Sequence, residues 1–307
     1  MGNIDLSVIT VSHNIKKMLK ECLGSVYKKG GDILLEVFVY DQSSTDGSAE
    51  MVSKNFPQVI LLRDRKNIGF GSSNNVAMKK ARGRYVLLLN PDTKIIQKNI
   101  FKEMIDWMDK NPKVGITSCA LVNPNKTLQG SGGYFPTLFR VLAWMFFLDD
   151  IPIIDRLIKP YHPLHAWSPI YKGENYFKRT RKQDWVTGAF FLIRKEVIND
   201  IGYFDKDYFA YVEEVDYCYR AAKSGWEVWY LPKWKTIHYG QVTAGSEFAL
   251  VNEMKNLKLF YKKHYPSWKL PILTLLIKAG TLLRMGVFGL LKGSEVAKTY
   301  AKAFRQT

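Results

Sequence analysis

The stretch Tyr85-Val86-Leu87-Leu88-Leu89-Asn90-Pro91-Asp92-Thr93 is an apolar run that stops abruptly at a polar turn. Its first five residues have the composition of a strand buried on both faces, as in a parallel sheet. Pro91 cannot donate to a ladder, so the strand should end there. Asp92 then follows the carboxyl end of a central strand, where open α/β sheets bind ligands. A carboxylate at this place can hold a divalent cation against a diphosphate. The alternative is an Asn-Pro-Asp turn without chemistry.

The segments around this strand alternate between strand and helix patterns. Strands are expected at 6–11, 34–40, 59–62, 85–89 and 114–122, with helices at 15–27, 71–80 and 98–109 among them. Further on we expect ordered structure to resume at 185–194, followed by a helix at 195–201, a strand at 226–231, His238 in a loop and a helix at 248–264. This alternation predicts an α/β fold with a mostly parallel, doubly wound sheet flanked by helices.

Two regions differ from this pattern. Residues 130–181 carry five prolines and the very apolar piece 138–148, which predicts an insertion at about 134–182 with one amphipathic helix. Residues 270–291 are apolar but interrupted by Lys278 and Arg284. Their length permits a membrane span, whereas the two cations favour a helix lying in the interface. A basic helix packed on the protein's own core stays open. We therefore expect a catalytic domain at 1–265 and membrane-associating amphipathic helices at 266–307.

The composition limits which binding partners and which cellular compartment are expected for this protein. The 307 residues carry a formal net charge of +17, which implies an anionic partner such as nucleic acid, an acidic membrane surface or a phosphorylated substrate. The three cysteines, Cys22, Cys119 and Cys218, lie far apart without metal-ligand spacing. This pattern predicts reduced thiols and a cytoplasmic location.

Three carboxylate groups follow strand ends or turns, and in one α/β sheet they can converge at a single edge. They are Asp41, Asp92 and the triple Glu213, Glu214 and Asp216. Such carboxylates could serve two functions: they could bind a metal–nucleotide complex, and they could deprotonate a hydroxyl group. Glu213 and Asp216 share a helix face, while Glu214 is rotated away from them. Carboxylates in a first helical turn are kept ionised by the helix dipole, as a base requires.

Five motifs in a fixed order resemble the inverting glycosyltransferases of family 2, which have the GT-A fold. Within that family they are most similar to the rhamnosyltransferase-like branch of bacterial surface-polysaccharide synthesis. The resemblance covers about residues 4–265. The motifs are 7–14, 39–48 (like V-D-N-x-S-x-D-G-S), 67–71 with 74–75, 89–93 (the branch's D-x-D), and 187–189 with 213–216 and His238.

The resemblance implies a role for each matching residue. The donor pocket would be formed by Thr10, Ser12, Asp41, Asp46, Asn67, Gly69, Phe70 and Asn90. Asp92 and His238 would bind Mg²⁺ or Mn²⁺ at the diphosphate, and Gly188 and Ala189 would border the acceptor. Glu214 would be the general base of a single inverting displacement, with Glu213 or Asp216 as the alternatives.

Two positions depart from the family pattern. Asn90 stands where a D-x-D motif begins with aspartate, which leaves fewer charged metal ligands. Glu214 stands where the family usually has aspartate, and glutamate reaches about one methylene further, roughly 1.5 Å.

The resemblance also implies a nucleotide-sugar donor, linked to dTDP or UDP, and a lipid-linked or glycan acceptor. With the cationic tail, it predicts a cytoplasmic enzyme peripherally associated with the anionic inner face of the cell membrane. No nucleic-acid partner is expected, and an oligomer is left open.

Three alternatives compete with a glycosyltransferase. A nucleotidyltransferase would use the same sheet and metal, but the first loop, Ser12-His13-Asn14, has no glycine. A basic nucleic-acid-binding or membrane-binding protein without catalysis agrees with the charge. However, the cations are not interleaved with stacking aromatics in a recognisable module. A dinucleotide oxidoreductase is weakest, because Gly69-x-Gly71 lacks the third glycine and does not follow the first strand.

Overall fold

The computed structural model describes residues 4–164, 173–240 and 246–307. The chain folds into two compact units. Unit 1 comprises Met1–Gly132, Phe177–Phe209 and Glu213–Thr243, and unit 2 comprises Gly133–Tyr176, Ala210–Val212 and Ala244–Thr307. Unit 2 therefore groups the predicted insertion and the helix before residue 265 with the C-terminal helices.

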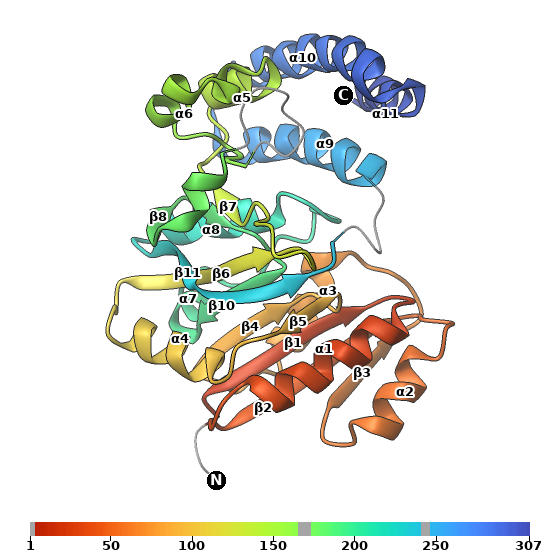
Figure 1. Cartoon of the computed structure of the whole chain (residues 1–307), viewed down its shortest axis with the longest axis vertical. Coiled ribbons are helices and arrows are strands. Elements are labelled where there is room, and N and C mark those ends of the chain that lie inside the picture. The colour runs from red at the N-terminus through yellow and green to blue at the C-terminus, as the bar shows by residue number, and fades with distance from the viewer. Residues whose placement is uncertain (1–3, 165–172, 241–245) are drawn as a thin grey trace. The chain divides into compact units, whose positions relative to one another are not determined.

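Within the described residues, unit 1 holds a nine-stranded sheet in the order β3-β2-β1-β4-β10-β6-β11-β5, with β8 also paired to β11 (Figure 1). β1, β2, β3 and β4 pair in parallel, as do β6 and β11, whereas β10 runs antiparallel between β4 and β6. The predicted mostly parallel sheet is confirmed. Its strands are β1 (Leu6–Ser12), β2 (Leu35–Gln42), β3 (Ile60–Asp64), β4 (Tyr85–Leu89), β5 (Thr93–Ile95), β6 (Val114–Val122), β8 (Arg181–Gln183), β10 (Phe190–Arg194) and β11 (Glu227–His238).

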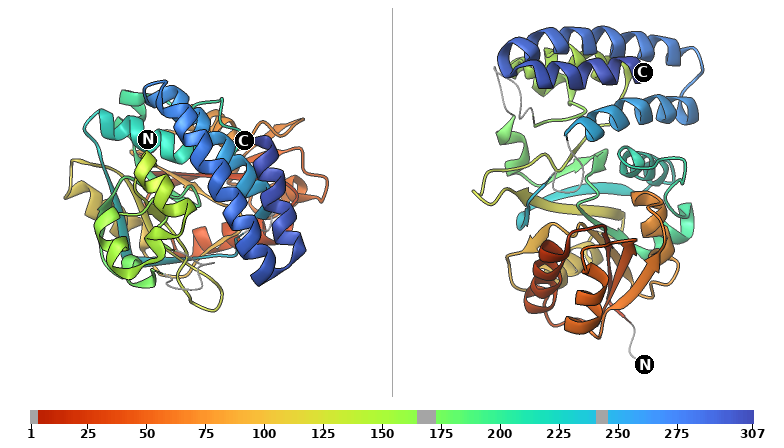
Figure 2. Two further views of the ribbon diagram at one scale, coloured as in Figure 1. Left: turned by 90° about the horizontal axis from the view of Figure 1, so that it is seen from above. Right: turned by 90° about the vertical axis from the view of Figure 1, so that its right-hand side faces the viewer.

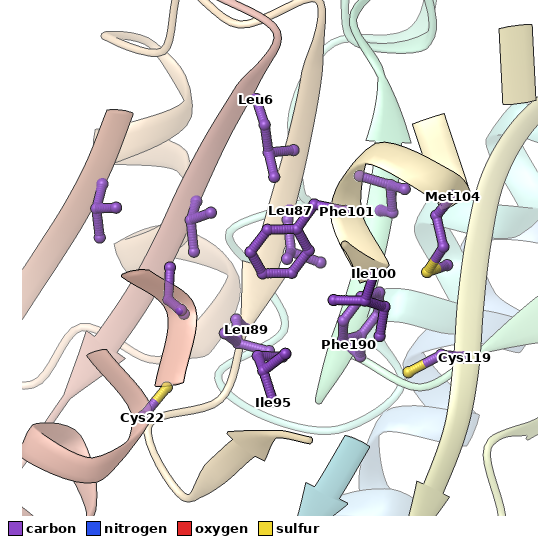
Figure 3. Close-up of a cluster of buried hydrophobic side chains, with 14 of the residues drawn as sticks. Leu6, Cys22, Leu87, Leu89, Ile95, Ile100, Phe101, Met104, Cys119 and Phe190 are labelled. Carbon is purple, nitrogen blue, oxygen red and sulfur yellow. The ribbon is translucent and has the colours of Figure 1, made fainter. Parts of the chain in front are cut away.

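Helices cover both faces of this sheet. On one face, α1 and α4 enclose a core in which Leu87 and Leu89 of β4 meet Cys22 of α1 and Phe101 of α4 (Figure 3). On the other face, Phe191 of β10 packs edge-on against Tyr217 of α8, with ring centroids 6.0 Å apart. The helices of unit 1 are α1 (Lys16–Lys29), α2 (Ser48–Asn55), α3 (Phe70–Met78), α4 (Ile100–Asp109), α7 (Lys195–Ile201) and α8 (Glu213–Lys223), with the 3-10 helix η2 (Glu174–Lys178) at the border of the two units.

One local prediction about a strand was wrong. His238 is the last residue of β11 rather than part of a loop, because the strand continues past Pro232 through a register shift between Leu231 and Lys235. A proline cannot donate to the ladder, so the pairing skips it and resumes. Residues 185–194, where ordered structure was expected to resume, form a short strand, β9 (Trp185–Val186), and β10. β9 pairs with β7 (Gly132–Gly133) in a separate two-stranded sheet.

Unit 2 is helical among its described residues, and its insertion holds more than the one predicted helix. α5 (Leu138–Met145), η1 (Leu148–Asp150) and α6 (Pro152–Ile158) replace it, since Phe147 has a φ of +60° and Pro152 starts a new helix. The C-terminal helices are α9 (Ser246–His264), α10 (Lys269–Lys292) and α11 (Ser294–Gln306). α10 packs on α5, α9 and α11. By length and composition alone, α10 is the one helix of the described chain that could cross a membrane.

Candidate active site

Buried polar atoms line the carboxyl ends of β1 and β2. Ser12 pairs with Asp41 in the parallel register, and Thr10 lies on the same face of β1 as Ser12. Among the described residues, Thr10 Oγ1, Ser12 Oγ and Asp41 Oδ2 have no hydrogen-bond partner. An unpaired buried polar atom costs free energy, so each of the three needs an explanation. A polar ligand at this sheet edge would satisfy them.

Asp46 was predicted to line the same donor pocket, but both of its carboxylate oxygens already accept hydrogen bonds from other residues of the protein. Its Oδ2 accepts the N–H of Lys16 at 2.8 Å, and its Oδ1 accepts the N–H and hydroxyl of Ser48 at 2.9 and 2.6 Å. Partial burial raises the pKa of Asp46, but these hydrogen bonds outweigh it and lower the pKa overall. Asp46 therefore links the first turns of α1 and α2. It also lines a surface cavity that includes none of the other predicted site residues of the described chain.

The glycine loop at 67–71 is built so that its backbone packs tightly. Asn67 Oδ1 accepts the N–H of Gly69 at 2.9 Å, and Gly69 has a φ of +88°. A Cβ on Gly69 would lie 2.3 Å from the carbonyl oxygen of Phe209, which accepts the N–H of Phe70 at 2.9 Å. Only glycine fits this conformation and this approach. Gln42 Oε1 supports the same loop by accepting from the N–H of Ile68 at 3.2 Å.

The loop and the predicted acceptor border come together. A Cβ on Gly188 would lie 3.1 Å from Cζ of Phe70, so the Phe70 ring lies directly against Gly188. The carbonyl of Ala189 accepts the N–H of Asn90 at 3.0 Å. Residues predicted for the donor side and the acceptor side of the site are thus neighbours in unit 1.

Asp92 and His238 face each other across the ends of β4 and β11. His238 Nε2 lies 3.4 Å from Asp92 Oδ1 and 3.5 Å from Asn90 Nδ2. The N–H of Tyr239 donates to the carbonyl of Asp92 at 2.9 Å, which ties the two segments together. The Tyr239 hydroxyl donates to Glu21 Oε2 at 3.1 Å, and Glu21 pairs with Lys94 beside the turn. Asp92 is 4% exposed, so the carboxylate is held in place rather than free in solvent.

Gln129, which the sequence did not point to, orients the His238 ring. Its Nε2 donates to the His238 carbonyl at 2.7 Å and to Asn123 Oδ1 at 2.7 Å. A carbonyl can only accept, so this bond fixes which end of the Gln129 amide is nitrogen. Gln129 Oε1, 2.8 Å from His238 Nδ1, is then an acceptor. In a neutral ring the proton then lies on Nδ1, and Nε2 is an acceptor that lies within 3.5 Å of the donor Asn90 Nδ2 and 3.4 Å from Asp92 Oδ1.

This arrangement fits a divalent cation. Asp92 Oδ1 and His238 Nε2 lie 3.4 Å apart, and a cation beside them would be bound by a carboxylate oxygen and an imidazole nitrogen. A histidine that donates its other ring N–H to a fixed acceptor is typical of metal ligands. The described residues contain no group of three or more His, Cys, Asp or Glu placed to hold a metal. The remaining ligands would have to come from Asn90, phosphate oxygens and water, which Mg²⁺ commonly retains.

The carboxylates at the start of α8 have three different environments. Asp216 Oδ2 accepts from Arg220 Nε at 2.9 Å and Asp216 Oδ1 accepts from the Tyr208 hydroxyl at 3.4 Å, so this side chain is engaged in the core. Glu213 is buried against α3, where a Cβ on Gly71 would lie 3.8 Å from it. Burial, with the charge of Glu214 added, raises the pKa of Glu213 well above its ordinary value. Glu214 is half-buried.

The backbone before α8 is strained. Tyr211 and Val212 have φ values of +70° and +72°, and a β-branched residue in this region is a clear outlier. Such strain is concentrated at functional sites and costs on the order of 1–3 kcal/mol per residue.

The family model for glycosyl transferase family 2 matches residues 7–202. An N-acetylglucosaminyl-diphospho-decaprenol L-rhamnosyltransferase of Mycobacterium tuberculosis is 24% identical over 276 residues, which is 86% of each chain. Rhamnosyltransferase WbbL of Escherichia coli is 26% identical over 188 residues, covering 59% of this chain and 64% of WbbL.

Among solved structures, the mannosyltransferase PcManGT from Pyrobaculum calidifontis, in complex with GDP-Man and Mn²⁺, superposes with a TM-score of 0.58. It is 17% identical, and the match covers 99% of this chain and 74% of that one. This likeness shows the fold.

Proposed function

This chain belongs to glycosyl transferase family 2 and is a glycosyltransferase, and we propose that it moves a hexose, with rhamnose as the first candidate, from a nucleoside-diphosphate donor. The observation that carries the proposal is the meeting of Asn90 and Asp92 with His238, 148 residues away from Asn90, beside buried polar atoms that lack partners. The nucleotidyltransferase and nucleic-acid-binding alternatives are not favoured, since neither accounts for the family match.

The donor would bind along the ends of β1, β2 and β4. Thr10, Ser12 and Asp41 offer the unpaired polar atoms that a nucleoside would satisfy, with Asp41 accepting from an N–H of the base. The Gly69–Phe70 turn would form the floor of the pocket, where its backbone can approach closely. Asp46 contributes by holding the adjacent turn, because both of its oxygens are engaged there.

Asp92 and His238 would hold Mg²⁺ or Mn²⁺, with Asn90 beside them. A bound cation would neutralise the charge that develops on the departing nucleoside diphosphate. Gln129 acts as a positioning residue, because it keeps the proton on Nδ1 of His238 and leaves Nε2 as the ligand atom. Asp92 is buried and its backbone is tied to Tyr239, so the ligands are arranged before the donor arrives.

Glu214 is the proposed general base. It would remove the proton of the acceptor hydroxyl as that oxygen attacks the anomeric carbon opposite the leaving diphosphate, which inverts the configuration. Burial raises the pKa of Glu213 well above its ordinary value, which makes Glu213 the poorer candidate for an ionised base. Asp216 positions the helix through Arg220. Gly188 and Ala189 would border the acceptor.

The relatives suggest the reaction partners. The Mycobacterium tuberculosis relative is named for an N-acetylglucosaminyl-diphospho-decaprenol acceptor and L-rhamnosyl transfer. We propose a dTDP- or UDP-linked sugar as donor and a lipid-linked or glycan hydroxyl as acceptor. A lipid-linked acceptor requires the enzyme to work at a bilayer, so we propose a peripheral location at the cytoplasmic face of the cell membrane.

Incubation of the full chain with dTDP-rhamnose, UDP-glucose, UDP-galactose or UDP-N-acetylglucosamine and a polyprenyl-diphosphate N-acetylglucosamine acceptor tests the proposal. We expect one donor to yield a product one sugar larger by mass spectrometry, with inverted anomeric configuration by NMR. Formation of a nucleotide-sugar and pyrophosphate from a nucleoside triphosphate and a sugar 1-phosphate, without sugar transfer to the acceptor, would instead support a nucleotidyltransferase.

A further inference from the structure

α10 buries its polar residues Thr281 and Arg284 together with apolar residues on the face that packs against the protein, and it exposes a second set of apolar residues. Its buried residues are Leu273, Ile277, Gly280, Thr281, Arg284 and Phe288. Apart from Lys292 at its end, its exposed residues are Pro271, Ile272, Leu275, Leu282, Leu283, Gly286, Leu290 and Leu291. Leu275 is 67% exposed and Leu290 is 90% exposed, so these are open side chains rather than the edges of a core.

The exposed residues form one stripe along the helix. At 3.6 residues per turn, Pro271, Ile272, Leu275, Leu282, Leu283, Gly286 and Leu290 fall within roughly a third of the circumference, and we call them the apolar stripe. The helix has 24 residues, so the stripe runs along most of about 36 Å. No charged residue lies within this sector; Lys278, which is partly buried, lies at its border with Nζ 5.5 Å from the ring centre of Phe304. Soluble proteins rarely expose an apolar strip of this extent without a partner.

The opposite face of α10 is satisfied within unit 2. Arg284 Nε donates to the carbonyl of Met145 at 3.1 Å, its Nη2 donates to the carbonyl of Trp144, and its guanidinium lies 4.4 Å from the ring centre of Phe147. A Cβ on Gly280 would lie 2.5 Å from the Cβ of Met145, so α10 and α5 are closely packed. The cation at 284 is therefore paired inside the protein and does not have to face lipid.

The neighbours of α10 disfavour a crossing orientation. Packed beside it, α9 exposes Lys262 and Lys263, and α11 exposes Lys298, Lys302 and Arg305. If α10 spanned a bilayer while it remained packed, these charged helices would enter the hydrocarbon with it, which is costly. A helix that presents one apolar stripe and keeps its cations beside it is suited to the interface plane.

We propose that α10 lies flat in one leaflet of an anionic bilayer, with the apolar stripe in the acyl region and the cations of α9 and α11 among the headgroups. α5 lies beside α10 (Figure 2), and α5 and α6 expose Phe139, Ile153 and Leu157, which would enlarge the apolar contact. Residues 258–307 carry ten Lys or Arg and a single acidic residue, Glu295. Anionic lipid complements this charge, whereas a second copy would bring the same cations face to face.

This inference deepens the proposed peripheral location but does not depend on sugar transfer. Binding to vesicles requires no donor and no acceptor. Failure of α10 to bind lipid would leave the proposed reaction standing, and failure of transfer would leave the lipid contact standing.

Co-sedimentation of the full chain with phosphatidylethanolamine–phosphatidylglycerol vesicles tests the contact. The double variant Leu275→Glu/Leu290→Glu should lower the partition coefficient at least 10-fold. The matched control is Leu34→Glu, an exposed leucine of unit 1, which should leave it unchanged. Because both targets are exposed, circular dichroism and thermal unfolding should show an intact fold. Wild-type binding should fall several-fold in 0.5 M salt and on vesicles without phosphatidylglycerol. Wild-type binding by the double variant would overturn the proposal.

Site-directed labels test the orientation. The three native cysteines are buried, so a fluorescent maleimide should react selectively with Leu275→Cys, Leu282→Cys or Leu290→Cys. A flat helix predicts that spin-labelled lipids quench all three labels with the same depth profile. A crossing helix would place the label at 282 deeper than those at 275 and 290, and this result would overturn the proposal. A second result would also overturn the proposal: the wild type forms a dimer in solution, and the double variant is monomeric but still binds vesicles. The stripe would then be an interface between copies.

Discussion

The sheet edge in unit 1 and the apolar stripe in unit 2 depart from the usual distribution of side chains in opposite directions. At the sheet edge, the hydroxyls of Thr10 and Ser12 and one oxygen of Asp41 are buried without partners among the described residues. On α10, leucines such as Leu275 and Leu290 are exposed without cover. Each arrangement costs stability in the isolated protein. The comparison supports the two proposals made above, that the sheet edge binds a polar ligand and that the stripe contacts an apolar surface.

Removal of the Asp92 carboxylate should have the largest effect on turnover. This effect should involve only the function of the sheet edge. We expect Asp92→Ala to lower turnover about 10³–10⁴-fold, because the charge on the leaving diphosphate loses its stabilisation. Vesicle binding should not change. The control is Asp106→Ala, which removes an exposed aspartate paired with Lys102 on α4. Steady-state kinetics with saturating donor measure both, and unchanged turnover for Asp92→Ala would remove the metal role.

The next largest effect should distinguish the two glutamates at the start of α8. Glu214→Gln should lower transfer about 10²–10³-fold while nucleotide affinity stays within a factor of about three, because only proton removal is lost. Glu213→Gln should keep most of the activity, since glutamine resembles the protonated acid in shape. Single-turnover transfer and equilibrium nucleotide binding distinguish the two variants. The reverse pattern would assign the base to Glu213.

Gln129→Leu should weaken metal binding at the sheet edge although it changes none of the proposed metal ligands. We expect Mn²⁺ affinity in the presence of nucleotide to fall about 10–100-fold, because the His238 tautomer is no longer fixed. Gln129→Glu keeps an acceptor for Nδ1 and should retain more of the affinity. Electron paramagnetic resonance titration gives the affinity, and ¹⁵N chemical shifts of the His238 ring give the tautomer. An unchanged tautomer in Gln129→Leu would show that Gln129 only packs.

Glu213 also makes stability depend on pH. Its pKa is raised in the folded protein, so the favourable contribution is complete below the unfolded value near 4.5 and is lost as pH rises through the folded value. The free energy of unfolding of Glu213→Gln relative to the wild type should therefore increase between pH 5 and 7, by up to about 1.4 kcal/mol per pH unit. Urea unfolding at the two pH values measures the difference. A constant difference would mean that Glu213 is ionised in the folded protein.

The smallest effect belongs to the stripe. Leu290→Ser should change the free energy of unfolding by no more than about 0.5 kcal/mol in solution, because this side chain is 90% exposed. Gly280→Leu, on the opposite face of α10, should destabilise unit 2 because its side chain would meet Met145. Chemical denaturation of both variants tests whether the two faces differ as the burial pattern indicates. A large loss in Leu290→Ser would mean that the stripe belongs to a core.

The sequence predicted the sheet and much of the candidate site because both depend on local patterns. The apolar run before Asn90 and the break at Pro91 identified β4, and the ordered motifs pointed to Asp92 and His238. Gln129 was missed, since its role depends on contacts with a residue more than a hundred positions away and no local pattern marks it. His238 was assigned to a loop because Pro232 ends the visible strand pattern, while tertiary pairing carries β11 past the proline.

Burial was the other quantity that the sequence could not supply. Spacing on a helix separated Glu214 from Glu213 and Asp216, but only packing shows that Glu213 is enclosed and that Asp216 is paired with Arg220. The apolar composition of α10 likewise left three arrangements open: a membrane span, a helix lying in the membrane interface, and a helix packed on the protein's own core. Apolar residues surround this helix, and the face that is covered depends on Gly280, Thr281 and Arg284 packing inward.

Calorimetric titration of UDP and dTDP into the full chain, with and without Mn²⁺, tests the central claim most directly when wild type is compared with His238→Ala. The claim is that Asp92 and His238 hold a cation that binds the donor diphosphate. It predicts that at least one nucleotide binds the wild type more than 10-fold more tightly with Mn²⁺, and that His238→Ala removes this gain but keeps the weak metal-free binding. Equal affinity with and without Mn²⁺ in the wild type, or a full gain retained in His238→Ala, would contradict it.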